Sequence, residues 1–424
     1  MKSDDDFQGL PKKSGFSARP WAAVIASFFL TSTFGIIYSY SDFFLPLAKQ
    51  FTWTHAVDST IPALALLVFS LGAILGGYVA DRIGFRRMSY IGTILVGVGT
   101  ILASQIQNYT QLLLLFGFIT PLGTSFVVII ATALPVRWFL RKRGLAVGVM
   151  AAGSGFGTLL VPPLIETLIQ PDGWRMGFFA LGAAFFVLLA VASYFTQAPD
   201  EQNLKPYGWH EIGEEKRSQL VDYTPKGAVS TKTFWTIYAM FFLGSFGATM
   251  YIVHVIPFAS TIGISPIDAS IALGILGAGS LFSRVLIGII SDRLNRTFGI
   301  IISFTIQFIS LAILELTGQG TLLLLCLCSF GIGFGYGGYL SDFIALTGDL
   351  FGRKHIQKIW ALDETAFGFA GLISPIIAGA FFDKLKSYTL IFQIASLAAL
   401  AGLILAVLLA RNLSKDRSAN QKIS

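Results

Sequence analysis

A single arginine stands in the middle of an otherwise apolar stretch of the chain. Arg284 lies in "GAGSLFSRVLIGIISDR", residues 277–293, where nearly every neighbour is apolar or small. At the centre of a membrane span an arginine costs about 2.5 to 3.5 kcal/mol on insertion scales, so it normally faces a partner or a wet cavity. Its planar guanidinium can donate two parallel hydrogen bonds to one carboxylate. Arg284 therefore indicates recognition of an anion, with an internal salt bridge between helices as the alternative.

Two adjacent acids lie in a second apolar run. Asp363 and Glu364, in "WALDETAFGF", sit several residues inside that run, at a depth similar to that of Arg284. Opposite charges inside a membrane tend to pair. If one of these carboxylates neutralises Arg284 in the empty protein, an arriving anion frees that carboxylate to be protonated. We therefore expect Asp363 or Glu364 to carry a coupled proton, with a structural helix-capping role as the alternative.

The elements that must position these residues are membrane helices. The chain is 54% hydrophobic and 12% charged, with a mean hydropathy of +0.71, which is too apolar for a soluble globular protein. Apolar runs of about 20 residues, the length that crosses a bilayer, recur along it, and none shows the alternation of barrel strands. We predict an all-α membrane protein with twelve transmembrane helices. The predicted spans are 20–47, 59–80, 88–106, 111–136, 144–169, 174–197, 232–260, 267–291, 298–316, 320–348, 355–382 and 387–411.

The predicted spans form two similar halves. An Asp-Arg pair follows the second span of each half, and both first spans share Phe-Gly, a tyrosine and a late proline. Internal duplication of this kind is typical of secondary transporters that bind near the membrane midplane, between the halves. The polar stretch between the halves has no apolar periodicity and is predicted to be a linker. The predicted organisation is a tail (1–19), a six-helix bundle (20–197), a linker (198–230), a second six-helix bundle (231–411) and a tail (412–424).

The basic residues are distributed unevenly between the two sides. If the termini share one side, 25 of the 30 lysines and arginines fall there, and Lys49, Arg175, Lys384 and Lys386 fall on the other side. The thirtieth, Arg284, lies within a span. By the positive-inside rule both termini are cytoplasmic, and the net charge of +7 reflects topology, not nucleic-acid binding. We expect a multi-pass protein of the plasma (cell) membrane.

Two patterns that could indicate a cofactor are better explained by packing. Cys326 and Cys328 lie two apart on opposite sides of a span, which suits neither a disulfide nor a metal site. The glycines of 333–338 match the dinucleotide pattern GxGxxG, but no βαβ unit surrounds them. The chain also lacks an ATP-binding GxxxxGK loop. We therefore predict no metal, no cofactor and no enzymatic activity.

The loop between the second and third spans resembles the signature loop of the major facilitator superfamily. It reads Gly77-Tyr-Val-Ala-Asp81-Arg82-Ile-Gly84-Phe-Arg86-Arg87, and the resemblance extends over the whole chain. It implies two bundles that rock around a central site, with this loop as a gating latch at the cytoplasmic face. The implied gating residues are Gly77, Asp81, Arg82, Gly84, Arg86 and Arg87, with Asp292 and Arg293 as their counterparts in the second half.

A narrower resemblance concerns residues 137–163 ("RWFLRKRGLAVGVMAAGSGFGTLLVPP") and 38–56 ("YSYSDFFLPLAKQFTWTHA"). Both are similar to the monocarboxylate porters and their oxalate:formate exchanger relatives. In that family an arginine of the eighth span binds the substrate carboxylate, and Arg284 takes its place. The resemblance further implies site roles for Tyr38 in the first span, Phe126 in the fourth as an apolar wall, and Tyr336 and Tyr339 in the tenth, with aromatic packing as the alternative for the last two.

The chain departs from both relatives at charged positions. The monocarboxylate pattern has an acid four residues before the arginine, where this chain has Ser280, and the exchangers have a lysine near Asp363. One cation beside a carboxylate suits a monoanion that moves with one proton. We expect a monomer that transports a small monocarboxylate such as lactate or pyruvate with H⁺ across a lipid bilayer. The alternatives are a carboxylate exchanger, an exporter of larger organic compounds, and a non-transporting carboxylate receptor.

Four further ionisable residues lie in or near spans. Asp42 and Glu166 come late in outward-running spans, so we expect them at the outer interface. His254 precedes a proline bend and is expected to be an ordinary hydrogen-bonded histidine. Asp342, near the inner end of its span, is expected to belong to a cytoplasmic gate.

Overall fold

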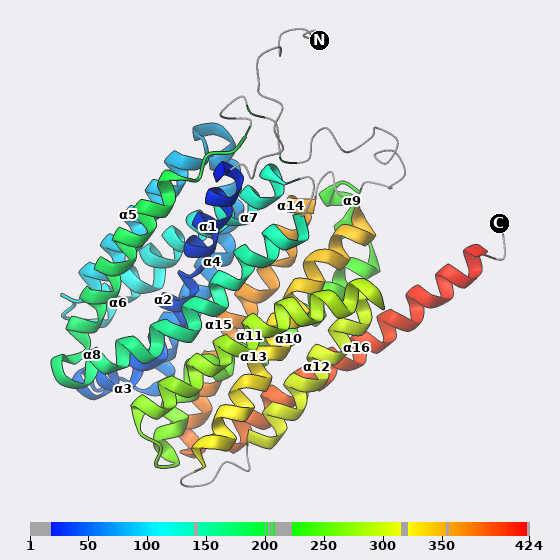
Figure 1. Cartoon of the computed structure of the whole chain (residues 1–424). Helices are drawn as coiled ribbons and strands as arrows, with labels where there is room; N and C mark the ends of the chain where they lie inside the picture. Colours follow the sequence, from blue (N-terminus) through cyan, green and yellow to red (C-terminus); the bar gives the residue numbers. More distant parts are fainter. Residues whose placement is uncertain are drawn as a thin grey trace.

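Long apolar helices run side by side from one end of the molecule to the other (Figure 1). The computed structural model describes residues 18–139, 143–199, 201, 204, 207, 223–314, 321–352 and 356–421. The elements are α1 (Ala18–Thr31), α2 (Phe34–Tyr38), α3 (Tyr40–Phe51), α4 (His55–Ile83), α5 (Phe85–Ala103), α6 (Tyr109–Leu114), the π-helical turn η2 (Leu115–Ile119), α7 (Thr120–Trp138), α8 (Arg143–Tyr194), α9 (Pro225–Val229), α10 (Lys232–Thr261), α11 (Pro266–Arg293), α12 (Arg296–Ile313), α13 (Leu322–Phe351), α14 (Ile356–Asp363), α15 (Thr365–Leu385) and α16 (Thr389–Gln421).

These elements make twelve membrane spans, as predicted. In the described chain, eleven helical stretches are long and apolar enough to cross a bilayer. The twelfth is α5, whose 19 residues carry Arg86 and Arg87 in the first turn and are therefore less hydropathic. The long α8 holds two spans, 145–170 and 173–194, because the chain turns at Gly173, whose φ of +81° favours glycine.

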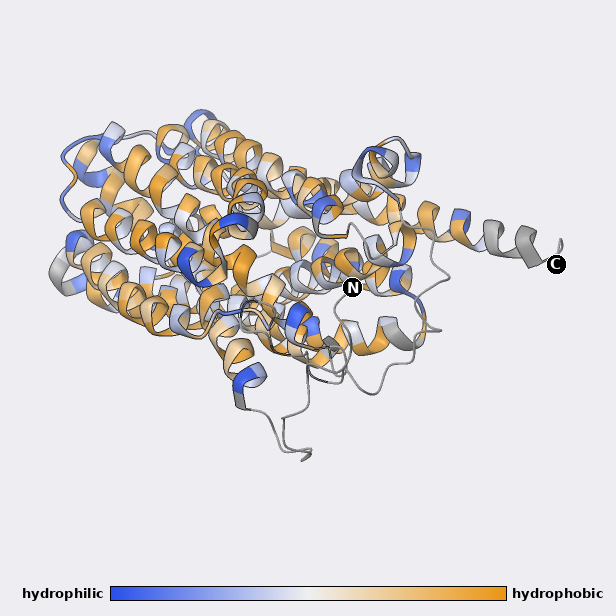
Figure 2. Cartoon of the chain, turned by 90° about the horizontal axis from the view of Figure 1, so that it is seen from above, coloured by the Kyte–Doolittle hydropathy of each residue, from blue (hydrophilic) through white to orange (hydrophobic). Residues whose placement is uncertain are grey.

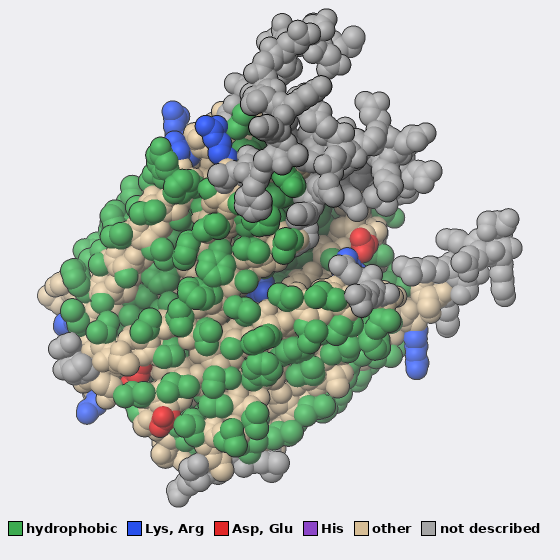
Figure 3. All heavy atoms as spheres, in the orientation of Figure 1, with side chains coloured by type: hydrophobic (Ala, Val, Ile, Leu, Met, Phe, Trp, Pro, Cys, Tyr) green, Lys and Arg blue, Asp and Glu red, His purple; other side chains and the backbone are tan. Residues whose placement is uncertain are grey.

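The spans divide into an N-terminal half, α1–α8, and a C-terminal half, α10–α16. In Figure 1 the blue-to-green helices lie on the left and the lime-to-red helices on the right. We call the end where α1 begins and α16 ends the tail end, and the end where α3 passes into α4 the far end. Seen from above, the helices are mainly hydrophobic along their lengths (Figure 2), and side chains on the flank shown in Figure 3 are mostly hydrophobic. This surface suits a lipid environment.

Small residues let the two halves approach backbone to backbone. The interface consists mainly of α4 against α15 and α8 against α11. A Cβ placed on Gly277 of α11 would lie 2.5 Å from the backbone nitrogen of Leu159, and one on Gly155 would lie 2.9 Å from the carbonyl oxygen of Gly277. Small residues at helix crossings are a common device in membranes, where water does not drive association.

The glycines of the tenth span also serve packing. A Cβ on Gly333 would clash with the carbonyl oxygen of Leu276 on α11, and one on Gly335 would lie 2.6 Å from the carbonyl oxygen of Ser303 on α12. The GxGxxG pattern is therefore a packing motif within the C-terminal half. Cys326 and Cys328 form no disulfide with each other.

Three spans are interrupted partway along their length. The first span breaks between α1 and α2 and again at Ser39, and the eleventh breaks between α14 and α15 at Glu364. The fourth contains the π-helical turn η2, after which the hydroxyl of Thr120 donates to the carbonyl oxygen of Leu115 at 3.0 Å. Interrupted helices and π-turns are frequent where transporters bind their substrates.

Close packing of α8 on α1 predicts a stability difference between two glycines of one helix. A Cβ on Gly153 would overlap the carbonyl oxygen of Phe28, whereas a Cβ on Gly148 meets no atom within 4 Å. We expect Gly153→Ala to lower the free energy of unfolding by about 1–3 kcal/mol. Gly148→Ala is the matched control and should be neutral or slightly stabilising. Equal melting temperatures for the two variants in detergent would contradict this packing.

Candidate functional site

Two of the predicted site residues meet where the halves join. The hydroxyl oxygens of Tyr38 and Tyr336 are 2.9 Å apart and form a hydrogen bond, and each residue is only 5% exposed. Tyr38 is the last residue of α2, directly before the break at Ser39, and Tyr336 lies near the middle of α13. This bond links the N-terminal half to the C-terminal half near mid-bundle.

Arg284 lies beside this pair of tyrosines. It is half-buried on α11 and interacts electrostatically with the hydroxyls of both Tyr38 and Tyr336. Its Nε donates to the hydroxyl of Ser280, one turn earlier on the same helix, at 3.4 Å. It forms no salt bridge with any acid in the part of the chain that the structure describes. Among the described residues, the polar groups beside the guanidinium are therefore neutral hydroxyls, which leaves it able to bind an anion.

The two acid candidates have different surroundings. Glu364 occupies the break between α14 and α15, is half-buried, and lies close enough to Tyr336 for an electrostatic interaction. Asp363 is fully buried within the C-terminal half, where it accepts a hydrogen bond from the hydroxyl of Thr347 at 3.2 Å. Neither forms the expected ion pair with Arg284 in this conformation. Only Glu364 shares a neighbour with the arginine.

The other two predicted site residues, Tyr339 and Phe126, each pack within one half. Tyr339 is fully buried in the C-terminal half, and its ring stacks on Phe304 with centroids 5.0 Å apart. Phe126 of α7 packs into the N-terminal half, where its Cδ1 would lie 3.1 Å from a Cβ on Gly76. The structure therefore brings together Arg284, Tyr38, Tyr336 and Glu364. The Tyr339 ring meets the Tyr336 ring edge to face, with centroids 5.9 Å apart, whereas Phe126 packs against α4 and α5.

The predicted gating loop is fixed to its own half. Gly84, with φ of +90°, ends α4 and starts α5. Arg86 donates from Nε to the carbonyl oxygen of Tyr194 at 3.0 Å and lies over that ring, while the backbone N–H of Phe85 donates to Glu201 Oε1 at 2.8 Å. These contacts tie the loop to the end of α8.

The remaining gating candidates for which the structure describes side chains make fewer contacts. Gly77 faces Ile129 loosely, and Arg82 and Arg87 are exposed. At the tail end the ammonium of Lys358 in the C-terminal half lies 5.7 Å from the centroid of the Tyr78 ring in the N-terminal half. The side chains of the last three candidates, Asp81, Asp292 and Arg293, lie outside the described residues.

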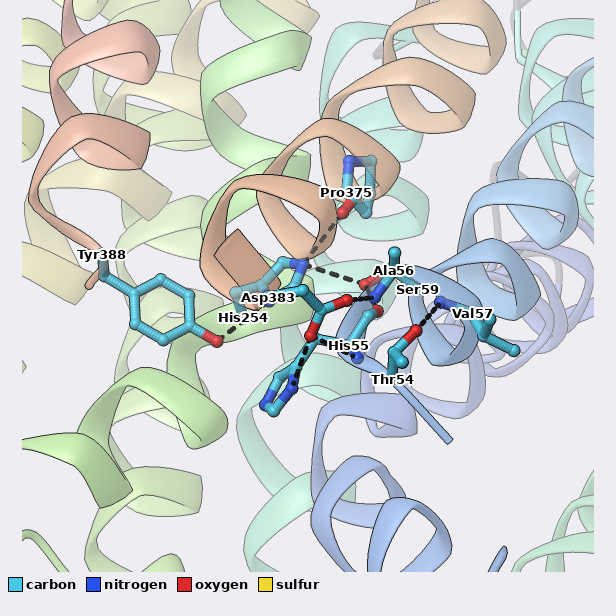
Figure 4. A network of polar contacts seen from close by, with 9 residues as sticks. All are labelled: Thr54, His55, Ala56, Val57, Ser59, His254, Pro375, Asp383 and Tyr388. Carbon is cyan, nitrogen blue, oxygen red and sulfur yellow. Dashed lines mark hydrogen bonds and ion pairs between the residues drawn. The ribbon is translucent and has the colours of Figure 1, made fainter. Parts of the chain in front are cut away.

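At the far end an acid of one half caps a helix of the other (Figure 4). Asp383 of α15 accepts from the backbone N–H groups of His55 and Ala56, at 3.1 and 2.9 Å, and its Oδ1 lies 3.5 Å from His55 Nδ1. These N–H groups belong to the first turn of α4, where helical donors lack partners and the helix dipole favours negative charge. Asp383 therefore joins the halves through a charged helix cap.

His254 of α10 contacts three residues beside this cap (Figure 4). Its Nε2 lies 3.0 Å from the carbonyl oxygen of Pro375 on α15 and 3.1 Å from the hydroxyl of Ser59 on α4. Its Nδ1 lies 3.2 Å from the hydroxyl of Tyr388. A neutral ring that donates from Nε2 and accepts at Nδ1 satisfies these contacts. We call the contacts of Asp383 and His254 the far-end latch.

Several other ionisable residues are buried. Asp42 and Glu166, which we expected at the outer interface, lie at the far end and are each only 1% exposed. Asp58 is fully buried as well and accepts a hydrogen bond from the Tyr40 hydroxyl at 2.5 Å. Asp342 lies toward the tail end of α13 and accepts from the hydroxyl of Ser291 at 2.6 Å.

Sequence reasoning missed Asp383 and Asp58 as functional candidates. Asp383 follows an apolar run at a span end, where an acid is normally read as solvated, and its partners lie more than 300 residues away in the chain. Asp58 lies in the first turn of α4, where acids are common caps. The one available signal was their position within or directly beside predicted spans.

Comparison with known proteins now identifies the family. The model of the Major Facilitator Superfamily matches residues 21–314 and 237–423. Monocarboxylate transporter 12 of Mus musculus is 24% identical over 408 residues, covering 91% of this chain and 84% of that protein. The oxalate:formate antiporter of Oxalobacter formigenes is 24% identical over 366 residues, covering 84% of each.

The fold has a close counterpart among solved structures. A bacterial homologue of the human lysosomal transporter Spinster, in an inward-facing and unoccupied conformation, superposes with a TM-score of 0.68 at 15% identity, covering 94% of this chain and 96% of that one. The family match, these relatives and the twelve-helix fold agree with one another. This chain belongs to the major facilitator superfamily and is a multi-pass membrane transporter of a small molecule, not an enzyme.

Proposed function

We propose that this transporter carries a small monocarboxylate, of the size of lactate or pyruvate, across the cell membrane together with one proton. The observation that carries the proposal is the position of Arg284. Its guanidinium lies where the two halves meet, beside the hydroxyls of Tyr38 and Tyr336, without an acidic partner among the described residues. A charge placed there is costly unless it binds an anion during the transport cycle.

The neighbours of Arg284 suit a carboxylate. The guanidinium can donate two parallel hydrogen bonds to the two carboxylate oxygens, and the tyrosine hydroxyls supply further donors. An incoming carboxylate would replace the bond between Tyr38 and Tyr336 with bonds to itself, so that both halves contact the substrate. The relatives named as a monocarboxylate transporter and an oxalate:formate antiporter support this substrate class.

Charge balance favours Glu364 as the proton carrier. In the empty protein the positive charge of Arg284 and the negative charge of an ionised Glu364 sum to zero. When a monoanion binds Arg284, a proton on Glu364 keeps the sum at zero, which avoids an uncompensated charge in a medium of low polarity. Transport is then electroneutral, and each unit of pH difference supplies about 1.36 kcal/mol, or roughly tenfold accumulation.

Transport requires the halves to change partners. In the described chain, the hydrogen bonds between helices of the two halves lie at mid-bundle or at the far end, in the far-end latch and near Ser41. With the tail end and both termini in the cytoplasm, as the bias of basic residues favours, this conformation is closed to the outside. Rocking of the halves would break the latch and expose Arg284 to the outside.

The direct test is uptake into proteoliposomes of purified protein. We expect saturable uptake of radiolabelled lactate or pyruvate that is driven by an inward proton gradient without a membrane potential. Uptake that needs a carboxylate inside the vesicle but ignores the pH gradient would instead establish exchange, as the name of the oxalate:formate relative suggests.

Loss of the guanidinium should abolish carboxylate recognition. We expect Arg284→Ala to lower saturable lactate uptake by about 30-fold or more, because an interaction between buried charges is lost. Arg284→Lys should recover little, since an ammonium lacks the planar fork. Arg175→Ala, which removes an exposed cation at the far end, is the control and should retain uptake. Normal uptake by Arg284→Ala would remove the central claim.

Neutralising the two acids separately should separate their roles. Glu364→Gln should abolish the dependence of uptake on the pH gradient while carboxylate binding persists, because the amide holds the site in its proton-loaded charge state. Asp363→Asn should keep that dependence, since Asp363 is hydrogen-bonded to Thr347 within one half. Uptake and binding are measured with the same labelled carboxylate. If both variants respond to pH as the parent does, the proton travels by another route.

Weakening the far-end latch should expose the interface between the halves. Ser41 is 1% exposed, and its hydroxyl donates to the Val253 carbonyl oxygen of the other half at 3.0 Å. For the test, Cys326 and Cys328 are changed to alanine and Ser41 is replaced by cysteine. We expect Asp383→Asn to raise the rate of maleimide labelling at position 41 about fivefold, since a lost helix cap costs about 1 kcal/mol.

The matched control for this variant is Asp349→Asn. Asp349 lies at the tail end, is 57% exposed and pairs with Arg296 at 3.6 Å within its own half, so its neutralisation should leave labelling unchanged. Equal labelling of the Asp383 and Asp349 variants would show that Asp383 does not hold the far end closed.

A further inference from the structure

Two buried acids lie on neighbouring helices at the far end, apart from the site around Arg284. Asp42 on α3 and Glu166 on α8 are each 1% exposed, and they are close enough to interact electrostatically. Their helices pack tightly, with the Phe43 and Phe178 rings stacked at 3.8 Å between centroids. Both acids belong to the N-terminal half.

Each acid has one oxygen bonded and one without a partner. Asp42 Oδ1 accepts from the hydroxyl of Ser270, and Glu166 Oε1 accepts from Gln170 Nε2 at 2.6 Å. The other oxygens, Asp42 Oδ2 and Glu166 Oε2, are buried without a hydrogen-bond partner among the described residues. Burying two adjacent anions in this way is strongly unfavourable. A proton on one of the carboxyls removes one of the two charges.

The surrounding helices supply no compensating cation. In the described chain neither acid forms an ion pair with a lysine, arginine or histidine. The ionisable groups at the far end of α4 are Asp58, bonded to Tyr40, and His55, which lies 3.5 Å from Asp383. On α10 the ionisable group is His254, whose ring is engaged in the far-end latch. On α11 the contact is the neutral Ser270 hydroxyl. A proton is the positive charge that fits there.

The hydrogen bond to Asp42 comes from the other half of the protein. Ser270 belongs to α11 of the C-terminal half, so its bond to Asp42 exists only while the far end is closed. Separation of the halves removes that donor and admits water to the pair. The two carboxylates are then solvated and can ionise independently.

We propose that closure of the far end binds one proton to the pair of acids Asp42 and Glu166, and that opening returns it to the same side. One carboxylate takes the proton from water on the far side as the halves close, and releases it to that water when they part. This proton controls the gate and is not transported, unlike the proton assigned to Glu364. The inference depends on alternating access but not on coupled proton transport.

The sign of the effect follows from linkage. The closed state binds one more proton than the open state, so acid favours closure, and this stabilisation is lost as the pH rises. The ratio of closed to open protein should fall by up to about tenfold for each unit of pH, over the range in which the pair loses its proton only in the open state.

Spin-label distance measurements on the full chain test this directly. Labels are placed at Gln107 and Lys384, exposed residues of opposite halves at the far end, after Cys326 and Cys328 are changed to alanine. We expect the short-distance, closed population to decline across a series of rising pH. In the double variant Asp42→Asn, Glu166→Gln, which carries neutral amides, the populations should not depend on pH.

A matched control is Asp268→Asn. Asp268 lies at the same end, in the first turn of α11, and accepts from Ser265 at 2.8 Å in an exposed position, so this variant should retain the pH response. A closed fraction that is constant with pH in the parent protein would overturn the proposal, as would an unchanged pH response in the double variant.

The outcome is separable from that of the proposed function. The number of protons carried per lactate, measured in proteoliposomes from the initial rates of proton and lactate uptake, should be the same in the double variant and the parent, because the gating proton does not cross. A lower number in the double variant would make the pair part of the transported-proton route and overturn its assignment as a gate. Absence of coupled protons in the parent would refute symport and leave the distance result to decide the gate.

Discussion

The absence of water in the bilayer interior governs the structure, because every polar group in a span must find its partner within the protein. Most do so locally: the Ser27 hydroxyl donates to the Ala23 carbonyl one turn back, and many other serines and threonines do the same. Charged groups cannot be satisfied so easily. Asp383 is stabilised by a helix terminus of the other half, whereas Arg284 and the Asp42–Glu166 pair lack an opposite charge among the described residues. The groups that the closed conformation leaves uncompensated are those to which we assign transport and gating.

The same constraint explains why glycine packing and polar contacts occur together at the interface. Gly155 and Gly277 let the backbones of α8 and α11 touch. Ser270, also on α11, donates a hydrogen bond to Asp42 of the other half. A close backbone approach excludes water, which strengthens each polar contact that forms and raises the cost of each one left unmade. In the proposed transport cycle we therefore expect the far end to have two states: joined, with the acids protected from water, or separated and hydrated. Intermediate spacings would leave buried groups with neither protein nor water partners.

The sequence was sufficient for the fold and for part of the site. Membrane spans follow from local apolar length, so twelve were predictable, and Arg284 was conspicuous because a cation in a span is costly. Contacts between halves were not predictable, since Tyr38 and Tyr336 are 298 residues apart and no local pattern pairs them. The side on which Phe126 lies was not predictable either, because the rotation of α7 about its axis is set by packing against α4 and α5. The burial of Asp42 depends on the conformational state, which a sequence does not specify.

The serine at position 280 affects how a proton could be coupled to substrate binding at Arg284. An acid four residues before Arg284 would lie one turn away on the same helix and stay beside the guanidinium in every conformation. Ser280 offers only a neutral hydroxyl there, at 3.4 Å from Nε, so the countercharge must come from another helix. In the proposed mechanism it comes from Glu364, at a break between two helical segments, where a small change in backbone angles can move the carboxylate toward or away from Arg284. Pairing between this acid and the arginine is then a property of the conformation, and a substrate anion that displaces the acid acts on the helix break as well as on the charge.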